Sequence, residues 1–165
     1  MRRAGHGRAA DGSIVVWSLA EGRRGRRWRE VVTTGEGIRS SLLLELDPDG
    51  RFSHLELSTP AGLLTLHPEG DGSLHGNAVR AGGIEHVRGL AWSAGRVVVL
   101  DGSAVCAAVA ATTVGSPAVS TARGLRIGLD LALELGEVTI DPGNATDGGL
   151  PNLRDSSSWP LDEPA

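Results

Sequence analysis

Hydrophobic and polar positions alternate with a period of two along much of the chain, most clearly over residues 41–79. Four short apolar runs in this stretch are separated by turns rich in proline, glycine and acidic residues, such as residues 47–50. Alternation of this kind is typical of strands with one buried face, and the turn residues favour tight reversals. Because connections this short join antiparallel neighbours, the stretch predicts a four-stranded antiparallel meander.

The same pattern, with β-branched and apolar runs, predicts strands elsewhere in the chain, at residues 13–19, 27–34, 84–92, 96–100, 125–135 and 138–140. In the run 125–135 every second residue is leucine or isoleucine, which predicts one long strand. Ser103 is a good N-cap, and the alanine-rich run after it predicts a short helix over residues 103–112. We therefore predict a mainly β fold of eight to ten strands, an antiparallel meander curled into a β-roll or half-barrel, with one short helix.

The length of 165 residues predicts one domain. Residues 1–12 are rich in glycine, alanine and arginine without periodicity, and we expect them to form a disordered tail. The β domain is predicted over residues 13–140. From residue 141 to residue 165 proline, glycine, asparagine, aspartate and serine dominate, which predicts an irregular C-terminal tail.

Composition excludes some functions and predicts few. The net charge of −4 gives no electrostatic basis for binding nucleic acid or an anionic membrane, and no apolar run is long enough to span a bilayer. The single Cys106 excludes an internal disulfide, and its apolar neighbours predict a buried, inert thiol. The residues after Met1 do not resemble a signal peptide, so we expect a cytoplasmic protein. We expect no cofactor, because no glycine-rich motif lies between a predicted strand and a helix.

The predicted meander has one leucine-rich core face and one mixed face. The mixed face is where we expect a ligand to bind, and its candidate residues are Phe52, His54, Glu56, His67, His75 and Asn77. His54, His67 and His75, with Glu45 and Glu56, could instead hold zinc or act as acid–base catalysts if their strands align. They could equally be surface histidines that never meet, and no metal site is predicted because no HxH or HExxH spacing is present.

Five arginines occur within residues 23–29, where they could grip a phosphate or form a solvated loop. The solvated loop is the simpler interpretation, because no helix N-terminus or glycine-rich phosphate cradle is recognisable beside them.

The order of elements resembles a bacterial glycolipid-binding family. The resemblance rests on an early tryptophan strand with Trp17, the paired strands LLLELDPDGRFSHLEL, the segment LLTLHPEGDGS, and Leu100-Asp101-Gly102. It covers residues 14–140 and implies a spiral β-roll with an apolar interior. The chain lacks the Thr-Asn-Thr-Leu-Pro type of stretch after the LDG segment, so the resemblance assigns no binding residue. The tail LPNLRDSSSWPLDEP is similar to tails of uncharacterised actinobacterial proteins.

The leading functional hypothesis is non-catalytic binding of a small amphipathic molecule, such as a lipid or glycolipid, on the mixed face or in the enclosed interior. Curved sheets with an apolar lining commonly hold such ligands. Two alternatives stay open at this point: a structural or interaction module that forms a homodimer through the mixed face, and a hydrolase-like enzyme that uses the strand histidines with Glu56.

Overall fold

The computed structural model describes residues 1–9 and 11–142, and these form eleven strands and one helix. Eight strands follow one another in an antiparallel meander, and three more form a small second sheet with the order β11-β10-β9. The strands are β1 (Arg2–Arg8), β2 (Ile14–Gly22), β3 (Gly25–Thr34), β4 (Gly37–Leu46), β5 (Phe52–Thr59), β6 (Gly62–Pro68), β7 (Ser73–Arg80), β8 (Gly83–Ala91), β9 (Val97–Leu100), β10 (Ser120–Ile127) and β11 (Leu133–Ile140), and the helix is α1 (Ala104–Val114). The predicted mainly β meander with one short helix is confirmed, with one strand more than the expected maximum.

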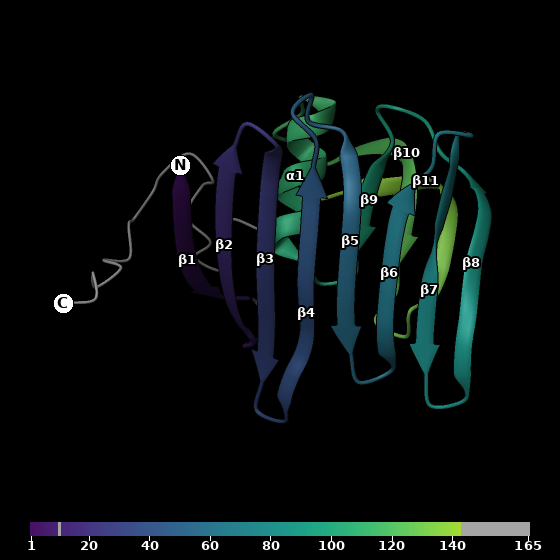
Figure 1. Ribbon diagram of the computed structural model, residues 1–165. Helices are drawn as coiled ribbons and strands as arrows, with labels where there is room; N and C mark the ends of the chain where they lie inside the picture. Colours follow the sequence, from purple (N-terminus) through teal and green to yellow (C-terminus); the bar gives the residue numbers. More distant parts are fainter. Residues whose placement is uncertain (10, 143–165) are drawn as a thin grey trace.

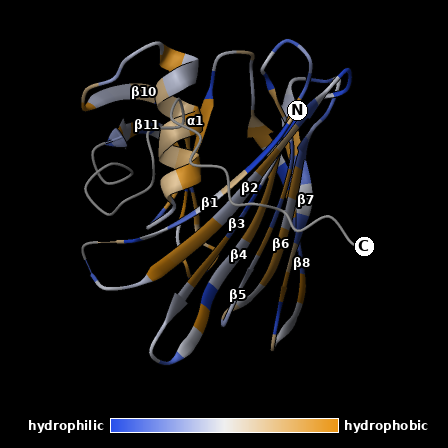
Figure 2. Cartoon of the chain, turned by 90° about the vertical axis from the view of Figure 1, so that its left-hand side faces the viewer, coloured by the Kyte–Doolittle hydropathy of each residue, from blue (hydrophilic) through white to orange (hydrophobic). Residues whose placement is uncertain are grey.

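The molecule has two layers. Figure 1 shows the eight-stranded sheet in front, with α1 behind β3 and β4 and the small sheet behind β5–β8. Viewed from the side in Figure 2, α1 and the small sheet lie on the same side of the large sheet. We call the covered side of the large sheet its inner face and the opposite side its outer face.

Alternation along the strands produces this arrangement. Leu55, Leu57, Leu64 and Leu66 project from neighbouring strands onto the inner face, and each has no exposed surface. They belong to one apolar cluster with side chains of α1 and the small sheet, including Cys106, Leu125 and Ile127. Burial of such side chains contributes about 1.5–3 kcal/mol each to folding, so the leucine pattern positions the second layer.

The loop between β4 and β5 shows why the sheet reverses so tightly. The Asp47 carboxylate accepts hydrogen bonds from the backbone N–H groups of Asp49 and Arg51 at 2.9 Å. Gly50 has a positive φ of 79°, a conformation that most residues avoid. The turn predicted from the sequence around Pro48 is thus present.

The helix connects two parallel strands, β9 and β10, which form the parallel pair of the small sheet. Ser103 is the N-cap and accepts a hydrogen bond from the backbone N–H of Cys106 at 3.0 Å. Gly115 ends the helix in the left-handed conformation. The predicted helix and its cap are confirmed, and Cys106 is buried as expected, with its pKa raised to about 12, chiefly by burial.

The expectation of a disordered tail over residues 1–12 is wrong. Residues Arg2–Arg8 form β1, which pairs with β2 over its whole length. Gly5 lies opposite Trp17 and is buried beside the indole ring. Gly5, one of the glycines that suggested disorder, makes room for this ring.

The prediction of one long strand over residues 125–135 is also wrong. β10 ends at Ile127, a turn follows, and β11 begins at Leu133. Leu131 adopts a positive φ of 66° in this turn, and its N–H donates to the carbonyl of Gly128. Leu131 is nevertheless buried in the main cluster, so its place in the leucine repeat reflects core packing in a turn rather than a continuous strand.

The structure bears only in part on two further predictions, the irregular C-terminal tail and the absence of a membrane span. The predicted C-terminal tail lies outside the described residues apart from Asp141 and Pro142. Within the described part of the chain, α1 is too short to cross a membrane, and no other helix is present.

Candidate functional site

The outer face of the large sheet carries five of the six predicted ligand-binding residues. Strand register places Glu45 directly opposite His54, and His67 directly opposite His75. Leu55 pairs with Leu66, so His54 and His67 occupy neighbouring positions one residue further along the two strands. The three histidines thus form a row across β5, β6 and β7, as the predicted register required.

Phe52 is the exception, and its predicted position on the mixed face is wrong. A register shift between β4 and β5 pairs Glu45 with His54 but Leu46 with Phe52, which leaves Ser53 as an extra residue. This bulge turns Phe52 to the inner face, where it is buried and packs edge-on against Trp92 with ring centroids 5.4 Å apart.

The remaining candidates pair locally. Nε2 of His54 lies 3.1 Å from Oε1 of Glu56, and Nδ1 of His86 lies 2.6 Å from Oδ1 of Asn77. His67 bonds to Glu69 in the turn between β6 and β7, and His75 bonds to Ser73 at the start of β7. In the described residues no three His, Cys, Asp or Glu side chains are placed to share a metal ion.

The arginine cluster of residues 23–29 is partly paired. Arg26 forms an ion pair with Glu21, and Arg27 forms one with Glu45 on the neighbouring strand β4. Arg23 and Arg24 lie in the turn between β2 and β3 and are exposed. This arrangement fits the solvated interpretation of the cluster.

A cavity of about 350 Å³ opens on the other side of the large sheet. We call it the α1 cleft, because it lies between the β1–β2 turn and the start of α1. Its apolar lining comprises Val15, Val99, Leu100, Ala104 and Ala107, and its charged lining comprises Arg8, Asp11, Arg39, Asp101 and Asp141. Two smaller cavities, of about 170 and 290 Å³, lie near the β4–β5 turn. Of the six predicted residues, only Phe52 lines any of these three cavities, and it lines the smallest.

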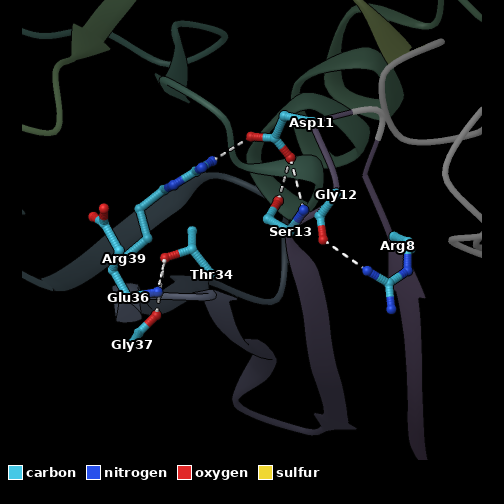
Figure 3. Close-up of polar contacts among 8 residues, drawn as sticks. All are labelled: Arg8, Asp11, Gly12, Ser13, Thr34, Glu36, Gly37 and Arg39. Atoms are coloured by element: carbon cyan, nitrogen blue, oxygen red, sulfur yellow. Dashed lines mark hydrogen bonds and ion pairs between the residues drawn. The ribbon is translucent and has the colours of Figure 1, made fainter.

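The charged rim of the α1 cleft is held by a small network (Figure 3). Asp11 accepts hydrogen bonds from both the backbone N–H and the hydroxyl of Ser13, and from Nη1 of Arg39 at 2.7 Å. The hydrogen bonds from Ser13, and then that from Arg39, hold the pKa of Asp11 well below its usual range. Arg8 donates to the carbonyl of Gly12 at 2.9 Å and has no acidic partner among the described residues. Arg8 therefore has a charge that a bound anion could neutralise.

Asp101, the acidic residue on the opposite wall of the cleft, does not neutralise the charge of Arg8. Its two carboxylate oxygens accept a bidentate pair of hydrogen bonds from Arg126, at 2.9 and 2.8 Å. Arg126 also contacts Glu134 on β11. The cleft thus has an apolar wall, a satisfied acidic wall and one arginine with spare donors, an arrangement that suits an amphipathic molecule with a polar or anionic end.

Sequence reasoning missed a buried carboxylate behind the cleft. Glu30 on β3 is almost fully buried, and its Oε2 accepts a hydrogen bond from the backbone N–H of Val105 at 2.9 Å. Burial raises the pKa of Glu30, and hydrogen bonds from Ser103 and the start of α1 oppose that rise. The first-turn N–H groups of Val105 and Cys106 are therefore satisfied from within the protein, and the α1 terminus offers a ligand fewer free donors.

One signal in the sequence pointed to Glu30: it shares parity with Trp28 and Val32 on its strand, and so falls on the core face. No comparable signal marked the α1 cleft, because its walls come from segments that are distant in sequence and meet only in the folded chain.

No family model, no curated protein and no solved structure matches the chain. The resemblance to glycolipid-binding proteins therefore stays a prediction, and the function has to be argued from the site.

Proposed function

We propose that the protein binds a small amphipathic molecule in the α1 cleft, without catalysis. The observation that supports this most directly is the cavity of about 350 Å³ in which apolar side chains lie beside two arginines and three aspartates. Ligand sites typically occupy about 300–1,000 Å³ and combine apolar walls with a few polar groups. The cavity lies at the small end of that range, which favours a single-chain or fused-ring ligand over a two-chain lipid.

The polarity of the walls indicates how such a ligand would be oriented. Val15, Leu100 and Ala107 come from β2, β9 and α1 and would contact the apolar part of the ligand. Arg8 and Arg39 lie on the sheet side of the cleft, so the polar end would point toward them. Arginine binds carboxylates, sulfonates and phosphates through paired hydrogen bonds. An anionic end is therefore the expected chemistry.

Of the two places expected for a ligand, the mixed face and the enclosed interior, the proposal abandons the mixed face and keeps to the inner side of the sheet. The expected mixed face carries the histidines, and the α1 cleft lies across the sheet from it. His54 and Glu56 lie close enough for acid–base chemistry, but neither lines the cleft. Binding in the cleft consequently needs neither residue.

A fluorescence titration with 1-anilinonaphthalene-8-sulfonate, an amphipathic anion, tests the proposal. The wild-type chain should bind one molecule with saturation. Ala107→Leu places extra carbon atoms in the cleft and should weaken binding by about tenfold or more, since a filled pocket loses its contacts. Ala132→Leu changes an exposed residue in the β10–β11 turn and serves as the matched control.

A second titration with the uncharged probe N-phenyl-1-naphthylamine distinguishes the contribution of the apolar part of the ligand from that of its anionic end. Arg8→Gln should weaken binding of the sulfonate probe and leave the affinity for the uncharged probe unchanged. Near-UV circular dichroism establishes that each variant is folded. A folded Ala107→Leu variant that binds the sulfonate probe as the wild type does would contradict binding in the cleft.

A further inference from the structure

Exposed apolar side chains gather on one face of the molecule. Nine large apolar side chains of the described residues are exposed, and six of them lie on the outer face of the large sheet: Ile14, Val16, Ile38, Leu63, Val79 and Ile84. We call these six residues the outer patch. Figure 1 shows the outer face in front, with no described element across it. Contiguous exposed apolar patches commonly mark an interaction surface.

Strand register joins most of the outer patch into one row. Direct cross-strand partners run without a break from β2 to β8: Val16, Val31, Ser41, Ser58, Leu63, Val79 and Ile84. Every member of this row is apolar or carries only a hydroxyl group. Ile14 and Ile38 lie beside the row on β2 and β4, and both pair with Thr33. The row therefore crosses seven strands without a charge.

A row without charges can face its own copy. Most dimers have a two-fold axis, so the same surface contributes to the contact from both copies. With the axis along the row, each of its residues lies opposite the same residue of the second copy, and no like charges meet. Arg29 lies next to the row on β3, and it would face the uncharged Thr33 of the other copy. The outer face is thus self-complementary about this axis.

The area of the face is sufficient for a stable dimer. Strands lie about 4.8 Å apart and rise about 3.3 Å per residue, so seven strands of about eight residues present a face of roughly 900 Å². A stable interface buries about 800 Å² on each partner. Flat faces of this kind pack against each other with their strands about 30° apart, as the two sheets of a β-sandwich do.

A lipid surface fits the outer patch less well. Proteins that bind at a membrane interface present aromatic and basic side chains around their apolar surface. The outer patch contains neither kind, and Trp17, Trp28 and Phe52 are buried. The net charge of −4 also opposes an anionic membrane.

We propose that the outer patch is the contact of a homodimer, in which the large sheets of two copies pack face to face about a two-fold axis along the row. The alternation of the sequence left such a contact on the mixed face open. The α1 cleft lies on the other side of the large sheet, so both copies keep an accessible cleft. The dimer therefore does not depend on the proposed ligand.

Size-exclusion chromatography with light scattering on the full chain tests the contact. The wild type should have twice the chain mass of 17.1 kDa. Leu63→Lys should raise the Kd of the dimer by about a hundredfold or more, because it places two like charges opposite each other in the contact. Val119→Lys adds the same charge at an exposed residue of the loop between α1 and β10 and should leave the mass unchanged. Near-UV circular dichroism establishes that each variant is folded.

A mixture of two variants tests the position of the axis. Leu63→Lys and Leu63→Glu should each be monomeric alone and form a mixed dimer together, since the row places lysine opposite glutamate. A mixture that stays monomeric would overturn the proposed arrangement.

Three further results would overturn the homodimer. The first is a wild type that keeps the mass of one chain up to about 100 µM, well above a micromolar Kd. The second is a Leu63→Lys variant that stays dimeric, which would place the contact elsewhere. The third is a monomeric wild type that binds phosphatidylcholine vesicles, which would assign the outer patch to a lipid surface.

Discussion

At the scale of single residues, Glu30 is the one charged side chain that is buried among the described residues. It lies on the inner face opposite Trp17 on β2, and its carboxylate caps the first turn of α1. Its second oxygen, Oε1, has no hydrogen-bond partner. A buried carboxylate with one unpaired oxygen is costly when charged, which is why its pKa is raised.

The raised pKa gives stability a predictable pH dependence. The ordinary pKa of glutamate is 4.5, and the folded chain keeps a proton on Glu30 to higher pH than that. The stabilising contribution of this group is therefore complete below the ordinary pKa and is lost as pH rises through the folded pKa. Glu30→Gln removes this loss. Its melting temperature relative to wild type should increase from about pH 4 to about pH 9, as measured by thermal denaturation across that range.

Glu36→Gln supplies the comparison for Glu30. Glu36 is an exposed glutamate in the turn between β3 and β4, and its replacement removes the same charge from the surface. If the melting temperature relative to wild type increases with pH only in Glu30→Gln, the increase is due to the buried carboxylate. The same rise in both variants would attribute it to net charge alone.

At the scale of elements, β1 depends on one close contact. A Cβ atom built on Gly5 would lie 2.7 Å from the Trp17 ring, closer than real side chains approach. Gly5→Ala should therefore destabilise the protein by about 1–3 kcal/mol through overpacking, measured as a lower melting temperature. Gly22→Ala is the matched control, because no atom lies within 4 Å of a Cβ built there. Equal melting temperatures for the two variants would show that β1 does not pack as described.

The elements that the sequence predicted share one property: their pattern depended on near neighbours. The turn at residues 47–50 and the N-cap at Ser103 were readable because backbone–side chain bonds span a few residues. The elements missed depended on distant partners. β1 is held by β2 and by the Trp17 ring. The glycine-rich sequence of β1 does not predict either contact.

The turn between β10 and β11 was missed for a different reason. Leu131 keeps the alternating spacing of its neighbours, yet it reaches the core from a left-handed turn. Its carbonyl accepts a hydrogen bond from Arg80, a residue at the end of β7. Periodicity identifies which residues are buried, and only the tertiary partner decides whether the backbone continues or turns.

At the scale of the whole molecule, the candidate sites differ in how far sequence could predict them. The histidine row needed only the register of neighbouring hairpins, and that register was correct apart from the bulge at Ser53. The α1 cleft joins residues from Arg8 to Asp141 and exists only when both layers have packed. Local patterns contain no information about such a junction.

The same packing predicts that the two layers unfold together. Leu55 and Leu66 of the large sheet share one continuous cluster with Ile127 of the small sheet. Removing a methylene from one layer should therefore lower the stability of both. Ile127→Val should cost about 0.5–1.5 kcal/mol, which lowers the melting temperature by about 2–4 °C for each kcal/mol in a chain of this size.

Tryptophan fluorescence reports that shift from the opposite layer. Trp17 and Trp28 are buried in the large sheet and Trp92 directly follows its last strand, β8, whereas the substitution lies in β10. In a Trp159→Phe background, the fluorescence and far-ultraviolet circular dichroism transitions should coincide and move by the same amount in Ile127→Val. A fluorescence transition that stays in place while the dichroism signal shifts would show that the small sheet unfolds on its own. The α1 cleft, which spans the junction between the layers, would then lose one wall before the other.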